Sequence, residues 1–239
     1  MDEVNKDRRL SPVYSVEEAA GYLHIPAATL RAWTFGRKMV TGDGYYEPVL
    51  QDVDRRVGRL SFYDLVEAHI LRAAIEKHVP LAQLRKGIAY LRGKHPTNPR
   101  PLLKYSFLTD GKFLLVGGML GPKSRDRDVL LNASSYGQLE MAGVIQQHLQ
   151  LVKSFDEYAT MLGRDQSKMP DTIFPNGGQR IVSITSGVFS GRPVIEGTRI
   201  PTSVVAQRFQ AGEDVKALAR DYRIPKEKIE AALQYETAA

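Results

Sequence analysis

The sequence predicts an α+β protein with a helix–turn–helix at each end and a smaller β-rich part between them. One pattern of apolar residues runs from Val16 to Trp33 and again from Val215 to Ala232, with the spacing of two short helices. Beyond residue 101 the helical period changes and short strand candidates follow. Stretches rich in proline, at 95–101 and 168–178, separate these regions as linkers.

Each copy of the pattern describes two helices joined by a tight turn. An Ile-Pro pair, Ile25-Pro26 in the first copy and Ile224-Pro225 in the second, ends one helix and begins the next. Proline suits a first helical turn and disfavours helix in the residue before it. The small residues Ala20 and Ala219 allow the paired helices to approach closely.

The N-terminal copy carries the signals of helix ends. Ser15 is a suitable N-cap, with Glu18 three residues later, as a capping box requires. The second helix is predicted from Ala27 to Thr34, and Gly36 ends it.

Beyond Gly36 the sequence predicts a wing and then two longer helices. Residues 36–60 show little helical periodicity and form an extended wing with a turn at 41–44. A strong helix with one apolar face begins at Ser61, and Pro80 opens another that ends by Gly93.

The middle of the chain is predicted to be a hairpin with further strands. Residues 104–108 and 112–116 flank Thr109-Asp-Gly, which is typical of a hairpin turn. Residues 128–132 are a third strand candidate. Residues 138–151 fit either a helix or a bend and another strand, and both alternatives stay open.

The C-terminal region is predicted to begin with a strand at 180–184 and a tight β-turn unit marked by Gly191 and Gly197. A helix over 204–210 follows, and then the second copy of the pattern. The predicted domains are residues 12–95, 102–170 and 180–236.

Composition is that of a globular protein in a reducing compartment. Of the 239 residues, 43% are hydrophobic, which suffices for packed cores. No stretch approaches the ~18 apolar residues of a membrane span, and the N-terminus lacks the apolar core of a signal peptide. The absence of cysteine excludes disulfides and thiolate sites. We therefore expect a cytoplasmic protein without a membrane partner.

The placement of charge favours the N-terminal copy as the DNA-binding one. The net charge of +6 is compatible with a polyanion partner. Residues 26–42 carry Arg31, Arg37 and Lys38 and no acid, whereas the charges of residues 226–230 nearly cancel. A phosphate backbone repels carboxylates at close range, so the first copy is the better candidate.

The sequence gives little support to the hypothesis that the protein is an enzyme. The five histidines show no ligand spacing, and Asp126 and Asp128 stand beside two arginines, as in a solvated turn. Gly117, Gly118 and Gly121 do not make a phosphate loop, because no Gly-Lys-Ser/Thr follows. We expect no catalytic residue, no metal site and no cofactor.

The first hundred residues resemble the winged helix-turn-helix of MerR-type regulators, through Tyr14–Leu23, Thr29–Trp33 and Leu60–Leu71 in that order. The resemblance implies that Thr29 and Arg31, on the second helix, face DNA and that the wing contacts the phosphate backbone. The alternative for each arginine is a solvated side chain, and Trp33 is interpreted as core. The candidate DNA-binding residues are Thr29, Arg31, Arg37, Lys38, Arg55 and Arg56.

One feature departs from the MerR pattern. MerR regulators continue into a long dimerising helix, whereas Pro96, Pro99 and Pro101 interrupt the chain here. The homodimer that we expect must therefore use another surface.

The C-terminal string Gly191–Pro201 is similar to the signature of a small domain family long labelled as of unknown function, and residues 209–222 match it too. Members of that family resemble antitoxins of type II toxin–antitoxin pairs, whose toxins are PIN-type ribonucleases. The whole chain resembles the longer VapB-type antitoxins. This implies two partners, operator DNA and a PIN-type ribonuclease toxin.

Arginines of the C-terminal region are the candidate toxin contacts, because PIN-type ribonucleases cluster carboxylates and arginine forks fit carboxylates. For Arg192 and Arg199 the alternative is a local salt bridge, such as one to Glu196 or Asp221. The candidate toxin-binding residues are Arg192, Arg199, Arg208 and Arg220.

The sequence therefore predicts an antitoxin that neutralises a PIN-type ribonuclease and represses its own operon by DNA binding. The alternative is an effector-controlled MerR-like transcription regulator with no toxin partner, whose middle part holds the effector. A neighbouring open reading frame for an acid-rich PIN-type ribonuclease would favour the first.

Overall fold

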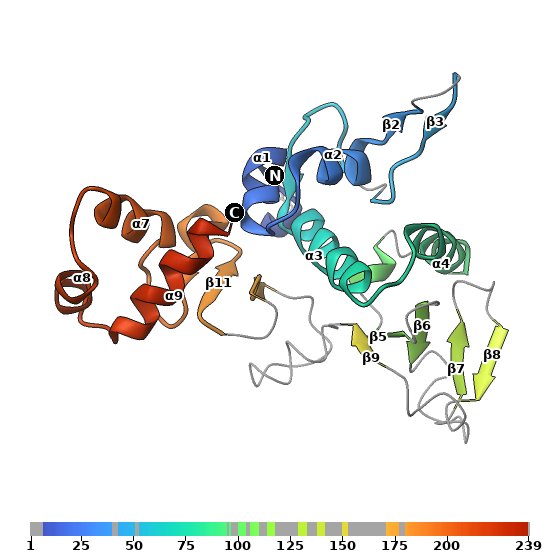
Figure 1. The fold of residues 1–239 in the computed structure, drawn as a ribbon. Helices are drawn as coiled ribbons and strands as arrows, with labels where there is room; N and C mark the ends of the chain where they lie inside the picture. Colours follow the sequence, from blue (N-terminus) through green and yellow to red (C-terminus); the bar gives the residue numbers. More distant parts are fainter. Residues whose placement is uncertain are drawn as a thin grey trace, which may run out of the picture. The chain divides into compact units, whose positions relative to one another are not determined.

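A computed structural model gives the architecture of the chain (Figure 1). Helices combine with small antiparallel sheets, which confirms the predicted α+β class. The chain divides into two units, each described by itself: Met1–Arg31, Asp54–Phe62 and Asp171–Ala239 form the first, and Ala32–Val53 and Tyr63–Pro170 form the second. The structure describes residues 7–39, 43–50, 53–94, 96, 100–103, 106–109, 114–117, 129–132, 138–141, 150–152, 171–176 and 180–238.

The N-terminal part of the first unit places a strand pair beside a helix–turn–helix. After a short 3-10 turn, η1 (Arg8–Leu10), strand β1 (Pro12–Tyr14) pairs antiparallel with β4 (Leu60–Ser61). Helix α1 (Val16–Tyr22) follows β1, and α2 (Ala27–Phe35) begins after a tight turn.

Local sequence signals determine where these helices begin and end. The predicted capping box is present: Ser15 Oγ accepts from the Glu18 N–H at 3.0 Å, and Glu18 Oε2 accepts from the Ser15 N–H at 2.9 Å. Gly36 adopts φ +79° directly after α2, as a C-terminal glycine does. The apolar positions of the first copy are all buried: Val16, Ala19, Ala20, Leu23, Ile25, Leu30 and Trp33.

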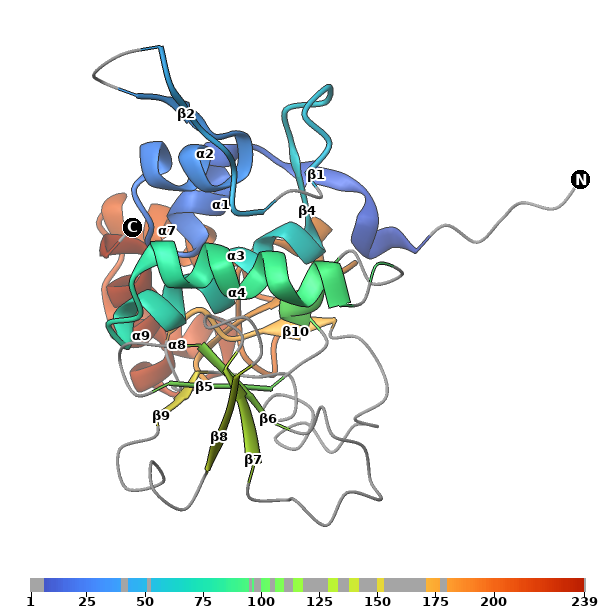
Figure 2. The same ribbon diagram turned by 90° about the vertical axis from the view of Figure 1, so that its right-hand side faces the viewer.

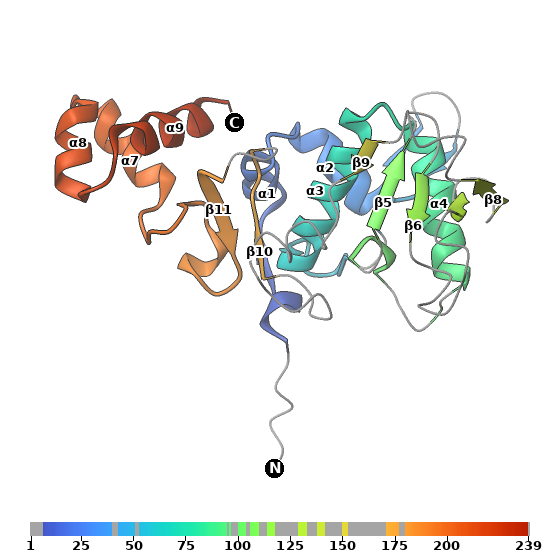
Figure 3. The ribbon, with the colours of Figure 1, turned by 90° about the horizontal axis from the view of Figure 1, so that it is seen from below.

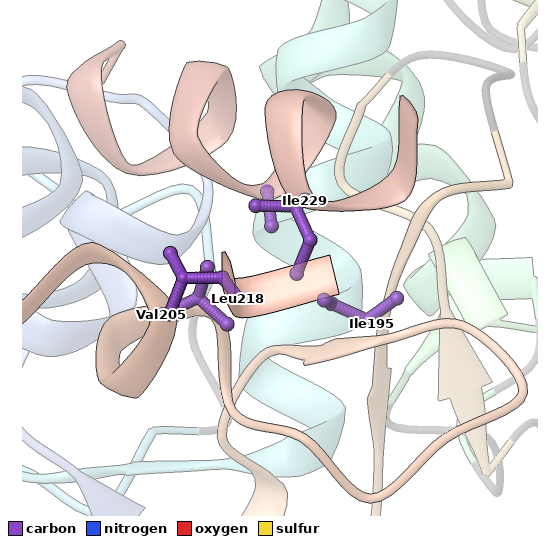
Figure 4. Close-up of a cluster of buried hydrophobic side chains, with 5 residues drawn as sticks. Ile195, Val205, Leu218 and Ile229 are labelled. Atoms are coloured by element: carbon purple, nitrogen blue, oxygen red, sulfur yellow. The ribbon is translucent and has the colours of Figure 1, made fainter. Parts of the chain in front are cut away.

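The C-terminal part of the first unit is a small sheet with three helices. Strands β10 (Thr172–Ile173), β11 (Val182–Thr185) and β12 (Val194–Ile195) form an antiparallel sheet in that order (Figure 3). Helices α7 (Thr202–Gln210), α8 (Val215–Tyr222) and α9 (Lys226–Thr237) follow. Side chains from β12 and all three helices converge in one core: Ile195, Val205, Leu218, Ile229 and Ala232 (Figure 4).

The linker predicted over 168–178 is wrong for its central residues. Thr172 and Ile173 are buried and form β10, where Thr172 pairs with Thr185 and Ile173 with Ile184. The hydroxyl groups of Thr172 and Thr185 are 2.9 Å apart. The strand is only two residues long and is flanked by turn-forming residues, so its own sequence does not predict it. Its pairing with β11 defines it.

The two helix–turn–helix copies close their turns with equivalent backbone hydrogen bonds. His24 in the first copy and Arg223 in the second occupy equivalent positions, and both are left-handed, with φ +50° and +55°. The next residue closes the turn in each case: the N–H of Ile25 donates to Ala20 O at 2.9 Å, and that of Ile224 to Ala219 O at 3.1 Å. The repeat predicted from apolar spacing is therefore a repeat of backbone geometry.

The glycine-rich string before α7 forms the predicted tight turn. The Ile195 N–H donates to Ile200 O at 2.9 Å, and the Thr198 N–H donates back to Ile195 O at 3.0 Å. Gly191 and Gly197 both have φ +76°, a conformation that side chains disfavour.

The second unit contains the wing and two longer helices (Figure 2). Strands β2 (Arg37–Lys38) and β3 (Tyr45–Tyr46) pair antiparallel as a hairpin within the predicted wing, and residues 41–42 of its predicted turn lie outside the described residues. Helices α3 (Phe62–Glu76) and α4 (Leu81–Lys94) begin and end close to the predicted positions. The predicted apolar face of α3 is buried, and so is the rest of the helix from Phe62 to Leu71, which includes Asp64 and Glu67.

A buried ion cluster holds the end of the first predicted linker against α3. Arg100 Nη1 is 2.8 Å from Asp64 Oδ1 and 2.6 Å from Glu67 Oε2, and all three side chains are at most 9% exposed. Arg100 also lies over the Tyr63 ring, 5.8 Å from its centroid. The 3-10 turn η2 (Pro101–Leu103), entirely buried, follows directly.

The middle part forms an antiparallel sheet in the order β8-β7-β6-β5-β9. The predicted hairpin is confirmed, since Phe107 pairs with Val116, and so is the third strand. The open alternative at 138–151 resolves toward strands, while the turn at 110–113 lies outside the described residues. The strands are β5 (Ser106–Thr109), β6 (Leu114–Gly117), β7 (Val129–Asn132), β8 (Gln138–Met141) and β9 (Gln150–Val152).

Within the described part of the chain, none of the helices combines the length and the apolar character that crossing a bilayer requires.

Candidate functional site

Helix α2 presents Arg31 to solvent, but not as an isolated charge. Arg31 Nη2 is 2.6 Å from Glu17 Oε1 on α1, and both side chains are more than half exposed. The backbone N–H of Glu17 and then the Arg31 guanidinium lower the pKa of the Glu17 carboxyl. Thr29, the other candidate on α2, is half-buried. A phosphate that approached Arg31 would compete with Glu17.

Three further arginines of the first unit lie just before β4, and they differ in their contacts. Arg55 and Arg56 are exposed, and the Arg56 N–H donates to Asp54 Oδ1 at 2.9 Å. Arg59 instead donates to the Val13 carbonyl. Arg55 and Arg56 therefore stay candidates for phosphate contact, whereas Arg59 fastens this segment to β1.

The β2–β3 hairpin exposes two cations and two tyrosines. Arg37 pairs with Tyr46 across the strands and lies 5.1 Å from its ring centroid, and Lys38 pairs with Tyr45. The Tyr45 hydroxyl donates to the carbonyl of Phe35, which is in the last turn of α2. Exposed tyrosines beside cations suit a nucleic-acid surface.

The base of the hairpin is fixed to α2 by backbone contacts. The N–H groups of Val49 and Leu50 both donate to Trp33 O, at 2.8 and 2.9 Å, and Trp33 is buried, as predicted. A Cβ on Gly36 would lie 2.5 Å from the Tyr45 hydroxyl, so the close approach requires glycine. Sequence reasoning missed the two tyrosines, whose signal was their position directly after the predicted wing turn.

We call strands β10–β12 and helices α7–α9, residues 171–238, the C-terminal module. In this module, Arg192, Arg199 and Arg220 are exposed and make no ion pair with any residue that the structure describes. For Arg192 and Arg199, the alternative of a local salt bridge to Glu196 or Asp221 is not found in the part of the chain that the structure describes. Three solvent-facing guanidinium groups are thus available to a carboxylate-bearing partner.

Arg208 is different, because acidic side chains already surround it. Its Nη2 is 2.5 Å from Glu213 Oε2 and 2.7 Å from Asp221 Oδ2, and its guanidinium lies 5.0 Å from the Tyr222 ring centroid. The Glu213 pair, followed by contacts with Tyr222 and Asp221, raises the pKa of Arg208. Arg208 therefore links α7 to α8.

Tyrosines line the region where the C-terminal module contacts α1, all within the first unit. Burial raises the pKa of the Tyr14 and Tyr22 hydroxyls, and nearby Arg192 partly offsets this at Tyr22. The two rings meet edge to face, with centroids 6.2 Å apart. The Tyr235 hydroxyl of α9 donates to Tyr22 O at 2.7 Å.

Among the described residues, no three His, Asp or Glu side chains gather in the manner of a metal site. The acidic pair Asp126 and Asp128 and the histidines at 95 and 148 lie outside the described residues.

Comparisons with known proteins agree with these two helix–turn–helix regions. Residues 12–88 match the family model described as "Putative DNA-binding HTH domain". Residues 182–235 match the one described as "Protein of unknown function (DUF433)". The first match confirms the predicted helix–turn–helix DNA-binding domain, and a MerR-like character stays a prediction.

Two mycobacterial proteins are similar over nearly the whole chain. One is the "Putative antitoxin VapB45" of Mycobacterium tuberculosis, 25% identical over 93% of this chain and 92% of that protein. The other is the "Uncharacterized protein Rv2308" of the same organism, 23% identical over 93% of this chain and 89% of that protein. The predicted likeness to VapB-type antitoxins is confirmed.

The crystal structure of Rv2018 from Mycobacterium tuberculosis has the same overall fold. It superposes with a TM-score of 0.56 at 19% identity, covering 95% of this chain and 99% of that one.

Proposed function

We propose that this chain is a cytoplasmic, non-enzymatic antitoxin that represses its own operon through the N-terminal helix–turn–helix and neutralises a PIN-type ribonuclease through the C-terminal module. One observation carries the proposal: a chain similar along its length to an antitoxin holds two helix–turn–helix copies with the same turn, of which the first has exposed Arg31 and the second exposed Glu230 at the equivalent position.

The DNA-binding role rests on the cations of the N-terminal copy and the hairpin. Arg31, Arg55 and Arg56 are exposed in the first unit, and Arg37 and Lys38 are exposed on β2. Exposed cations on a winged helix–turn–helix can neutralise DNA phosphates. Thr29 lies on the same helix as Arg31. We propose these residues as the operator contacts.

The C-terminal copy differs from the first at the two positions that correspond to Thr29 and Arg31. Glu230 takes the position of Arg31, and it is exposed. Lys228 takes the position of Thr29, and its Nζ donates to Glu196 O at 2.9 Å within the module. A carboxylate at the position of the DNA-facing arginine would repel phosphate, so this copy fits a protein partner better.

The toxin-binding role rests on the arginines of the same module. Arg192, Arg199 and Arg220 offer exposed guanidinium groups to the clustered carboxylates of a PIN-type ribonuclease, while Arg208 holds α7 and α8 in place for them. The proposal needs no cofactor. It includes a homodimer formed through a surface other than a long C-terminal helix.

Two measurements test the two roles. Binding of the full chain to its own promoter should be salt-dependent, and Arg31→Ala should lower the slope of log K against log salt by about one unit, if Arg31 contacts one phosphate. The ribonuclease activity of the neighbouring open reading frame's product should fall when the full chain is added in equimolar amount. An unchanged ribonuclease, with promoter binding that responds to a small molecule, would favour the effector-controlled regulator instead.

A further inference from the structure

The last helix of the chain ends against the turn of the N-terminal helix–turn–helix, and both belong to the first unit. Tyr235 on α9 is 3% exposed. Its hydroxyl donates to the carbonyl of Tyr22, the last residue of α1, at 2.7 Å. Its ring lies 4.6 Å from that of His24, the left-handed residue of the turn. One side chain of the C-terminal module thus contacts both the end of α1 and the turn that leads to α2.

A second contact joins the same two modules. Gly191 is buried against Tyr14, where a Cβ would lie 1.8 Å from the Tyr14 hydroxyl. The Tyr14 ring in turn packs against Tyr22. The C-terminal module therefore contacts the N-terminal one at Tyr14 and at the turn, and Tyr22 lies between the two contacts.

The internal repeat shows that the turn does not need this cover in order to form. In the C-terminal copy the equivalents of Tyr22 and His24 are Asp221 and Arg223, and both are exposed. The backbone of that turn is nevertheless the same, with the same left-handed residue. The contact of Tyr235 therefore adds something beyond formation of the motif.

We propose that Tyr235 is a positioning residue for operator binding, which holds the α1–α2 turn so that α2 is presented to DNA in one orientation. The proposal rests on the operator-binding role proposed above. The turn sets the direction in which α2 leaves α1, and a helix that must fit a groove loses affinity when its orientation varies. Helix α9 also packs in the C-terminal core through Ile229 and Ala232, so it connects that core to the α1–α2 turn.

Promoter binding by the full chain tests this role with a matched pair of variants. Tyr235→Phe removes only the hydroxyl that contacts Tyr22, and we expect the dissociation constant to rise roughly threefold to tenfold, the worth of one hydrogen bond. The salt slope should stay unchanged, because no phosphate contact is lost. Tyr222→Phe removes a hydroxyl from the same module, next to Arg208, and should leave the dissociation constant unchanged.

Hydrogen exchange supplies a readout that does not depend on DNA. Amides of residues 23–26 should exchange faster in Tyr235→Phe than in Tyr222→Phe, at a temperature where both variants are fully folded. Tyr235→Ala, which also removes the ring beside His24, should enlarge both effects. If Tyr235→Ala does not fold, the Phe variant carries the test alone.

The outcomes separate this proposal from the one it rests on. A wild-type chain that binds its promoter while Tyr235→Phe binds equally well overturns the positioning role and leaves the operator role intact. A fall in affinity shared by Tyr222→Phe also overturns it. A wild-type chain with no salt-dependent promoter binding overturns the operator role, and the positioning role with it.

Discussion

At the scale of single residues, the pair Glu17–Arg31 sets how easily α2 meets a phosphate. The two side chains are 2.6 Å apart and exposed, so the pair adds little stability and is readily exchanged. Glu17→Gln removes both the competitor for Arg31 and a carboxylate near the proposed DNA surface. We expect operator affinity to rise about threefold, measured by titration at constant salt.

Glu227→Gln is the control for this change, because it removes one exposed acid from the other helix–turn–helix copy. Its effect on operator affinity should be smaller. An equal gain from both variants would attribute the effect to net charge and remove the special role of the Arg31 pair.

A comparison of Gly191 with Gly187 distinguishes the effect of backbone conformation on stability from the effect of close packing. Both have positive φ, +76° and +81°, but a Cβ on Gly191 meets Tyr14 whereas one on Gly187 meets nothing within 4 Å. Gly187→Ala should lower the free energy of unfolding by about 1 kcal/mol, from backbone strain alone. Gly191→Ala should lower it by about 2–4 kcal/mol, since Tyr14 must also move. Equal losses in urea unfolding would show that the Tyr14 contact has no weight.

At the scale of elements, the ion cluster on α3 is one of the contacts that sequence reasoning missed. Arg100 faces two buried carboxylates, and removing it leaves both charges without that partner in a dry site. Arg100→Met should lower the free energy of unfolding by about 3–5 kcal/mol. Arg72→Met breaks an exposed pair with Glu76 on the same helix and should cost only about 0.3–0.5 kcal/mol. Similar losses for the two variants in urea unfolding would contradict the burial of the cluster.

The link between α7 and α8 should make stability depend on pH in an acidic window. Arg208 lowers the pKa of Glu213 below its ordinary value of 4.5. The ionised pair therefore stabilises the fold fully above that value, and this stabilisation is lost as the pH falls through the lower folded-state pKa. Between about pH 5 and about pH 3, the wild type should lose more unfolding free energy than Glu213→Gln. Parallel pH profiles would mean that the pair contributes nothing.

At the scale of the whole molecule, local sequence signals predicted what is local in the structure. The capping box at Ser15, the end of α2 at Gly36 and the hairpin around residue 110 all follow from a few neighbouring residues. The repeat of apolar spacings predicted both turns, whereas the left-handed residues at 24 and 223 became visible only in the structure.

Contacts between distant segments were not predictable in the same way. Strand β10 inside a predicted linker, and Arg100 at the end of another, each depend on a partner far along the chain. The same is true of the candidate sites. The motif around Gly191 and Gly197 pointed to Arg192 and Arg199, and both are exposed. The contacts of Arg208 with Glu213 and Asp221 could be identified only in the structure.

The central claim is that one chain carries two separate binding surfaces, for a toxin and for DNA. It is tested most directly by co-purification of the neighbouring open reading frame's product with the wild type, with Arg192→Glu/Arg199→Glu and with Arg31→Glu/Arg37→Glu. We predict that the product is retained by the wild type and by the Arg31/Arg37 variant and is lost by the Arg192/Arg199 variant. Only the Arg192/Arg199 variant reverses the charges proposed to meet carboxylates of the toxin. Failure of the wild type to retain it, or its loss in the Arg31/Arg37 variant alone, would contradict the account.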